Sequence, residues 1–352
     1  MNIIMQISYR WGLGFLSACF FVGIGLFFLA SSGGQPTIPT TSDCANRTAE
    51  RQADCWLEKA ISYLEIKGVA AAVQHISDAV QTEAAMAGEC HALMHAIGEH
   101  SYHLYTKDLL FGINQTVTYC TYGFYHGFIT ESVVSDGDFA VAREFCSFIN
   151  EALSKIGFTD SDAECYHGFG HAVVDDHITA PFITAHEVAD VGLKLCTDLS
   201  DTLLQYRNCA GGVYNGVANL YLDGIYPWPE LEEDDPLRIC TSQPKEIQST
   251  CYAYFARVVL QYAEYDFDRA LQAAEKIPPG DNQHDLVSNL SVSLAPRISS
   301  PTAFNQALAT CRNLDTSKLH QQCVWGLAVG LVQFASPGQE YTKQCDYVSR
   351  WN

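Results

Sequence analysis

Regularly spaced cysteines constrain the fold of this chain more than any other feature. Four pairs are separated by 11–19 residues: Cys146 and Cys165, Cys196 and Cys209, Cys240 and Cys251, and Cys311 and Cys323. In each pair the first cysteine ends a helical pattern and the second begins another, as in GLKLC and CAGGVYNGVANL. The pattern predicts αα-hairpins whose loops are closed by disulfides. Closing a loop of about 15 residues stabilises a fold by roughly 3 kcal/mol in the chain-entropy model.

A unit without cysteines supports this pairing. Residues 266–296 have the same two-helix pattern and lack both cysteines together, as expected if the two normally bond each other. The second helices begin near residues 120, 165, 209, 251, 287 and 323, so the period is about 35–45 residues. We therefore predict that residues 44–352 form an all-α solenoid of about six or seven hairpins. A closed α/α barrel is the alternative.

The remaining cysteines are less regular. Cys44 pairs with Cys55 on spacing, and Cys90 is assigned to Cys120 although each opens a helix without a preceding partner. Cys345 is left over, which leaves open a free thiol, a bond to another chain, or a different pairing at 90 and 120. So many cysteines are typical of an oxidising compartment outside the cytoplasm.

The N-terminus indicates export. Residues 1–10 contain one positive charge, Arg10, and residues 11–30 form an uncharged apolar run about 30 Å long as a helix. We expect a cytoplasmic N-terminus, a transmembrane anchor, a linker over 31–43 and an extracytoplasmic domain over 44–352. The alternative is a cleaved signal peptide, which would leave a secreted or periplasmic protein.

One helical segment resembles a known repeat. DFDRALQAAEKI, residues 266–277, is similar to the first helix of a tetratricopeptide or Sel1-like repeat in its placement of small alanines. The resemblance extends loosely over residues 130–335, although paired cysteines are not typical of either family. It implies a fold in which repeats act as scaffolds and binding surfaces, and it implies no activity. The His-Gly pairs also resemble lanthionine-cyclase-like α/α barrels, but the spacing of their Cys-Cys-His zinc site is not matched.

Several second helices share a glycine three residues after the cysteine. These are Gly123, Gly168, Gly212 and Gly326. Each glycine inside a helix is about 1 kcal/mol less favourable than alanine, so the chain must gain something at these positions. We interpret them as places where neighbouring helices approach closely, with the approach of a ligand as the alternative.

Seven of the twelve histidines fall between residues 91 and 171. Two HxxxH pairs are each followed by a carboxylate one turn later, and a further histidine lies between the pairs. Such residues share one helix face and suit a metal ion. The candidate ligands are His91, His95, Glu99, His126, His167, His171 and Asp175. Imidazole and carboxylate ligands suit Zn, Cu or Fe, and the missing CxxCH motif argues against covalent c-type haem.

The arrangement of the helices limits these options. In a flat layer with 8–10 Å between neighbours, helices 91–99 and 165–175 lie nearer 20 Å apart. His126 then completes a site on one side or the other, while strong curvature or barrel closure brings all five histidines together. The alternative to a metal is a polar ladder of histidines between repeats, which Asn215 favours because it takes the place of His126 and His171.

The net charge of −20 and the absence of a basic patch argue against nucleic-acid binding. Three hypotheses of function remain. The first is an exported binding protein with a His-rich metal or ligand site, and the second is a structural scaffold that docks other exported proteins. The third is a metal-dependent enzyme of unknown substrate.

Overall fold

The computed structural model describes residues 44, 47, 49–82, 89–105, 112–137, 139–158, 161–177, 184–224, 235–298 and 300–333. All of them belong to one compact unit, Ile38–Asn352. The predictions for residues 1–10, 11–30 and 31–43 and for Cys345 lie outside the described residues. Within the described part, no helix combines the length and the apolar character needed to cross a membrane.

Every regular element in these residues is helical, which confirms the all-α prediction. The α-helices are α2 (Ala49–Lys67), α3 (Val69–Thr82), α4 (Cys90–Tyr105), α5 (Tyr119–Asp136), α6 (Phe139–Ser154), α7 (Ser161–His177), α8 (Ala185–Leu199), α9 (Leu203–Leu222), α11 (Arg238–Thr241), α12 (Lys245–Tyr262), α13 (Phe267–Glu275), α14 (Asp281–Leu294), α15 (Pro301–Arg312) and α16 (Ser317–Gln333). Two short 3₁₀ helices, η2 (Gln115–Thr118) and η3 (Ala295–Arg297), complete the described elements.

Local signals explain several helix starts. Thr184 and Glu187 form a capping box at the start of α8, and Thr202 and Gln205 form another at α9. In each box the threonine hydroxyl accepts from a backbone N–H that has no partner within the helix, and the longer side chain returns the bond. Asp266 caps α13 in the simpler way.

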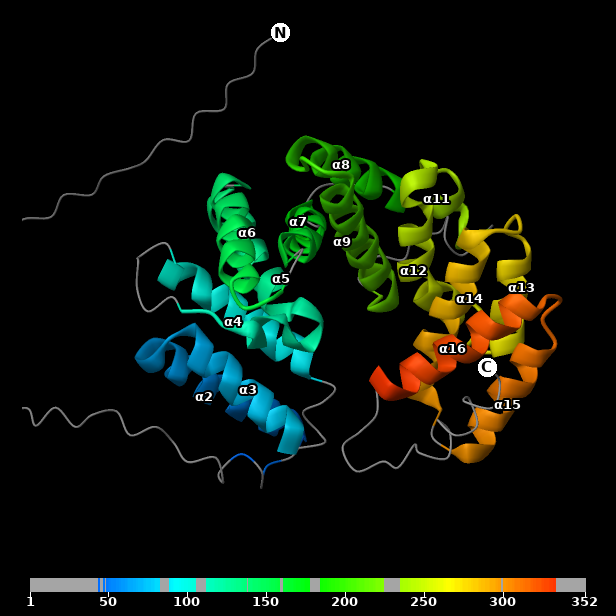
Figure 1. Cartoon of the computed structure of the whole chain (residues 1–352), viewed down its shortest axis with the longest axis horizontal. Helices are drawn as coiled ribbons and strands as arrows, with labels where there is room; N and C mark the ends of the chain where they lie inside the picture. Colours follow the sequence, from blue (N-terminus) through cyan, green and yellow to red (C-terminus); the bar gives the residue numbers. More distant parts are fainter. Residues whose placement is uncertain are drawn as a thin grey trace, which may run out of the picture. The chain divides into compact units, whose positions relative to one another are not determined.

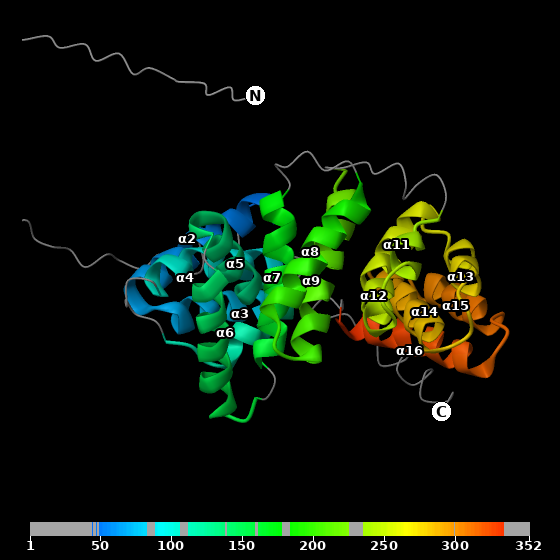
Figure 2. The same cartoon turned by 90° about the horizontal axis from the view of Figure 1, so that it is seen from above.

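The helices pack in pairs along a continuous row. Helices α4, α5, α7, α9, α12, α14 and α16 each pack on the next, and we call them the inner helices (Figures 1 and 2). The helices that precede them in each hairpin, α6, α8, α13 and α15, pack against the same row. The packed helix pairs agree with a helical-repeat fold. The solenoid, the barrel and the tetratricopeptide or Sel1 likeness stay predictions.

Six disulfides bond the described cysteines: Cys44–Cys55, Cys90–Cys120, Cys146–Cys165, Cys196–Cys209, Cys240–Cys251 and Cys311–Cys323. They include the five pairs expected from their short spacing and the less regular assignment of Cys90 to Cys120. Four of them join an inner helix to the helix that precedes it in the chain. Cys90–Cys120 differs because it joins the starts of α4 and α5, two neighbouring inner helices. This bridge lies at one end of the histidine-bearing helices.

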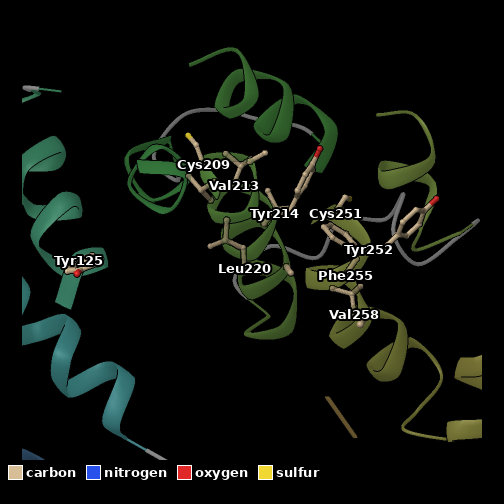
Figure 3. Close-up of a cluster of buried hydrophobic side chains, with 14 of the residues drawn as sticks. Tyr125, Cys209, Val213, Tyr214, Leu220, Cys251, Tyr252, Phe255 and Val258 are labelled. Carbon is tan, nitrogen blue, oxygen red and sulfur yellow. The ribbon is translucent and has the colours of Figure 1, made fainter. Parts of the chain in front are cut away.

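Interior glycines bring the inner helices together, which confirms the packing interpretation. A β-carbon on Gly123 would lie 2.5 Å from the carbonyl oxygen of His91, and one on Gly212 would collide with that of His167. The same relation holds between Gly326 on α16 and Ser288 on α14. Large buried side chains complete the core beside these glycines, as Figure 3 shows for Tyr214 of α9 and Phe255 of α12.

Candidate metal centre

The five predicted histidines form one continuous cluster on three inner helices. His91 and His95 come from α4, His126 from α5, and His167 and His171 from α7. The ring of His126 lies 5.0 Å from that of His91, 4.8 Å from that of His167 and 4.7 Å from that of His171, centre to centre. His126 therefore contacts histidines on both sides. It links the histidines of α4 to those of α7, although a flat layer would place these two helices nearer 20 Å apart.

Three of these side chains form the candidate centre. His126, His167 and His171 are buried, and one possible ligand nitrogen from each lies within 4.8 Å of the others. Zn–N bonds of about 2.0–2.1 Å in a tetrahedral site would place two nitrogens about 3.3 Å apart. Side-chain movements of about 1 Å would therefore bring the three nitrogens to bonding geometry. These three histidines could hold a metal ion, and we refer to them as the triad.

Hydrogen bonds define which nitrogen of His126 is available. Nδ1 of His91 lies 3.0 Å from the carbonyl oxygen of Cys120, and because a carbonyl only accepts, this nitrogen carries the proton. Nε2 of His91 is then an acceptor, and Nδ1 of His126 donates to it across 3.3 Å. The proton of His126 is thus on Nδ1, and its Nε2 keeps a lone pair. Within the described residues this buried Nε2 has no hydrogen-bond partner.

His167 is held from a different side. Its imidazole hydrogen-bonds the backbone of Asn208, and its Nδ1 lies 3.3 Å from the hydroxyl oxygen of Tyr254. A histidine whose other nitrogen is bonded to a backbone group or a side chain is the usual arrangement around a protein-bound metal, because that bond orients the ring. Nε2 of His167 has the amide nitrogen of Asn215 3.5 Å away.

Asn215 and Arg257 continue the row of polar side chains beyond the triad. A guanidinium nitrogen of Arg257 donates to Oδ1 of Asn215 and, across 2.9 Å, to Oδ1 of Asn219. Because Arg257 can only donate, the amide nitrogen of Asn215 must face the histidines, and it donates to Nε2 of His171 across 2.9 Å. This is the bonding expected of a polar ladder at Asn215.

Sequence reasoning missed Arg257 and Tyr254. A signal for Arg257 was present, since it follows Cys251 by the same six residues that separate His171 from Cys165. Without a glycine or histidine near it in that helix, the arginine resembled an ordinary surface charge.

Burial keeps the triad in the form that binds metals. Desolvation, followed by the neighbouring imidazoles, holds the pKa values of His126 and His171 well below the ordinary value, and burial lowers the pKa of His167 to about 4. The three rings are therefore neutral at pH 7, with a lone pair on each. The charge of Arg257 also lowers the pKa of His171, so the same charge opposes a bound cation.

A pocket of about 470 Å³ lies beside the triad, and His126 and His171 form part of its wall. Three side chains of α4 also line the pocket: His91, His95 and Glu99. Asp223, which follows α9, lines it as well. Glu99 does not join the triad. It pairs with Nδ1 of His95 at 3.1 Å, and this bond lowers the pKa of Glu99. The side chain of Asp175 lies outside the described residues.

Comparisons with models of protein families, with curated proteins and with solved structures found no match for this chain. The geometry of the site and the disulfides therefore carry the functional conclusions. The six disulfides indicate an oxidising, extracellular environment.

Proposed function

We propose that this is an exported, membrane-anchored helical protein that binds a transition-metal ion through His126, His167 and His171. Residues 11–30 are the proposed anchor, on the basis of their length and apolar composition. Zn, Cu and Fe all suit three neutral imidazoles.

The bare Nε2 of His126 is the observation that carries this proposal. Leaving a buried polar atom without a hydrogen bond is unfavourable by about 1–3 kcal/mol, so such an atom usually has a partner. Here the atom is an imidazole lone pair, and two further histidines contribute nitrogens within 4.8 Å. A metal ion would supply the missing partner for His126 and would use the neutral state of all three rings.

Metal analysis of the full-length protein in detergent tests this function. The protein is incubated with Zn²⁺, Cu²⁺ or Fe²⁺, dialysed and analysed for metal, and about one ion per chain is expected for a single three-nitrogen site. Replacing both His126→Ala and His171→Ala should abolish this binding. The matched control, His100→Ala with His103→Ala, removes two exposed histidines of α4 and should retain it. Absence of bound metal in the wild type, or its retention by the triad variant, would contradict the proposal.

A structural scaffold is the second candidate, and the bond between Asn215 and His171 favours it. In this case the histidines serve only to join successive hairpins, and the exposed surface docks other exported proteins. A scaffold predicts the same melting temperature with chelator and with added metal, whereas a metal centre predicts a higher one with metal.

The pocket favours a third candidate, a metal-dependent enzyme. An ion at the triad would lie next to a space of about 470 Å³, large enough for a small molecule. Metal-dependent hydrolysis of chromogenic ester or phosphodiester probes, lost in the double triad variant, would support an enzyme. Equal rates for the wild type and that variant would reject hydrolysis of these probes at the triad.

A further inference from the structure

The amide group of Asn215 lies beside the two triad nitrogens of α7. Its nitrogen is 2.9 Å from Nε2 of His171 and 3.5 Å from Nε2 of His167. An ion bound by these two nitrogens at about 2.0–2.1 Å would need the same space and the same lone pairs. The amide hydrogen and the ion cannot use one lone pair together.

Arg257 holds this amide in place. Its guanidinium donates to the oxygens of both Asn215 and Asn219, one turn apart on α9. The side chain is partly buried, and burial lowers the pKa of Arg257 while the negative charge of Asp223 raises it. The positive charge of Arg257 lowers the pKa of His171 and therefore disfavours a second positive charge at the triad.

From these contacts we propose that Asn215 blocks the metal centre in the metal-free protein, and that Arg257 stabilises this blocked state. Metal binding requires the amide to swing away from His171 and His167. The centre then binds its ion less tightly than it would without the amide. This inference rests on the proposed function, because it concerns the same triad.

The effect on affinity has a definite sign. Binding to the wild type must break the hydrogen bond from Asn215 to His171, and a variant without the amide avoids this loss. A single hydrogen bond of ordinary strength corresponds to an affinity about threefold to tenfold tighter when the competing donor is absent. A helper role for Asn215, such as orienting His171 for the ion, predicts the opposite sign.

Titration of full-length protein with Co²⁺ and Zn²⁺ tests the inference. Asn215→Ala should bind both ions about threefold to tenfold more tightly than the wild type. Arg257→Met, which frees the amide and removes the charge while keeping a long side chain, should shift affinity in the same direction. The matched control is Asn305→Ala, which removes an exposed asparagine of α15 that takes no part in these contacts, and its affinity should equal that of the wild type. Melting curves establish that each variant is folded.

The outcomes separate the two proposals. Wild-type binding with unchanged or weaker affinity in both Asn215→Ala and Arg257→Met would overturn the blocked state and leave the metal centre standing. If the wild type binds no ion and Asn215→Ala does, the blocked state holds and metal binding by the natural protein fails. If no protein in the series binds either ion, both proposals fail.

Discussion

The carbonyl oxygen of His91 lies 2.5 Å from the position that a β-carbon on Gly123 would occupy. No ordinary side chain fits at that distance, so the close approach of α4 and α5 requires glycine at residue 123, as it also does at Gly98 and Gly127. The imidazole of the same His91 accepts the hydrogen bond from His126. The packing of α4 on α5 and the hydrogen bond from His126 to His91 therefore both depend on the contact between His91 and Gly123.

Gly123→Ala should destabilise the protein by about 2 kcal/mol or more, although alanine favours a helix. The added carbon meets backbone, which can yield only if α4 and α5 separate. Gly112→Ala is the control because its β-carbon meets nothing within 4 Å, and its effect should stay within about 0.5 kcal/mol. Urea unfolding measures both changes. Equal stability of the two variants would show that the helices tolerate the extra carbon.

Replacing the disulfide between α8 and α9 should weaken the fold through its unfolded state. Cys196→Ser with Cys209→Ser opens a loop of 13 residues and should lower the free energy of unfolding by roughly 3 kcal/mol. Both sulfurs are buried, so the serine hydroxyls add a small further loss. Denaturation of the variant under non-reducing conditions measures the change. A loss below about 0.5 kcal/mol would mean that residual hairpin structure already restricts the unfolded chain without the disulfide.

His75 should make stability depend on pH. Its ring stacks on Tyr63 at 4.6 Å and lies 5.2 Å from Trp56, and burial, followed by the charge of Lys59, lowers its pKa below 6.5. As the pH falls below about 6.5, His75 becomes protonated in the unfolded chain but stays neutral in the folded protein. The free energy of unfolding therefore decreases until the pH reaches the pKa of His75 in the folded protein.

His75→Phe keeps an aromatic ring and removes this titration. Between pH 7.5 and pH 5, its melting temperature should therefore fall less than that of the wild type. His100→Ala, at an exposed position, is the control and should follow the wild-type curve. Parallel curves for His75→Phe and the wild type would show that the buried ring does not influence the acid response.

Metal affinity should depend on His91 even though His91 is outside the triad. His91→Ala removes the acceptor for Nδ1–H of His126, so the ring of His126 loses its fixed orientation. Loss of such an outer partner typically weakens metal binding about 10- to 100-fold. Competition titration with a chromogenic chelator measures the change, with His100→Ala as control. Equal affinity in the two variants would mean that packing alone orients His126.

Local features of this protein follow from its sequence. Cys196 and Cys209 are close along the chain, so their spacing restricts the hairpin between them whatever the rest of the molecule does. The capping box at Thr202 and Gln205 involves neighbours within one helical turn. The glycine spacing indicates close contact between helices because few other interactions offset glycine in a helix. Helical class and hairpin order are determined at this level.

Which histidines meet was decided by the tertiary structure. The sequence placed the five histidines on three helices, and the distance between these helices depends on how each hairpin packs on the next. Glu99 of α4 and Asp223 after α9 line one pocket although they are far apart in the sequence. The roles of Asn215 and Arg257 also arise only in three dimensions, because their bonds to each other and to His171 join three different helices. Periodicity specifies the face of one helix that a residue occupies, while packing decides which other side chains that face meets.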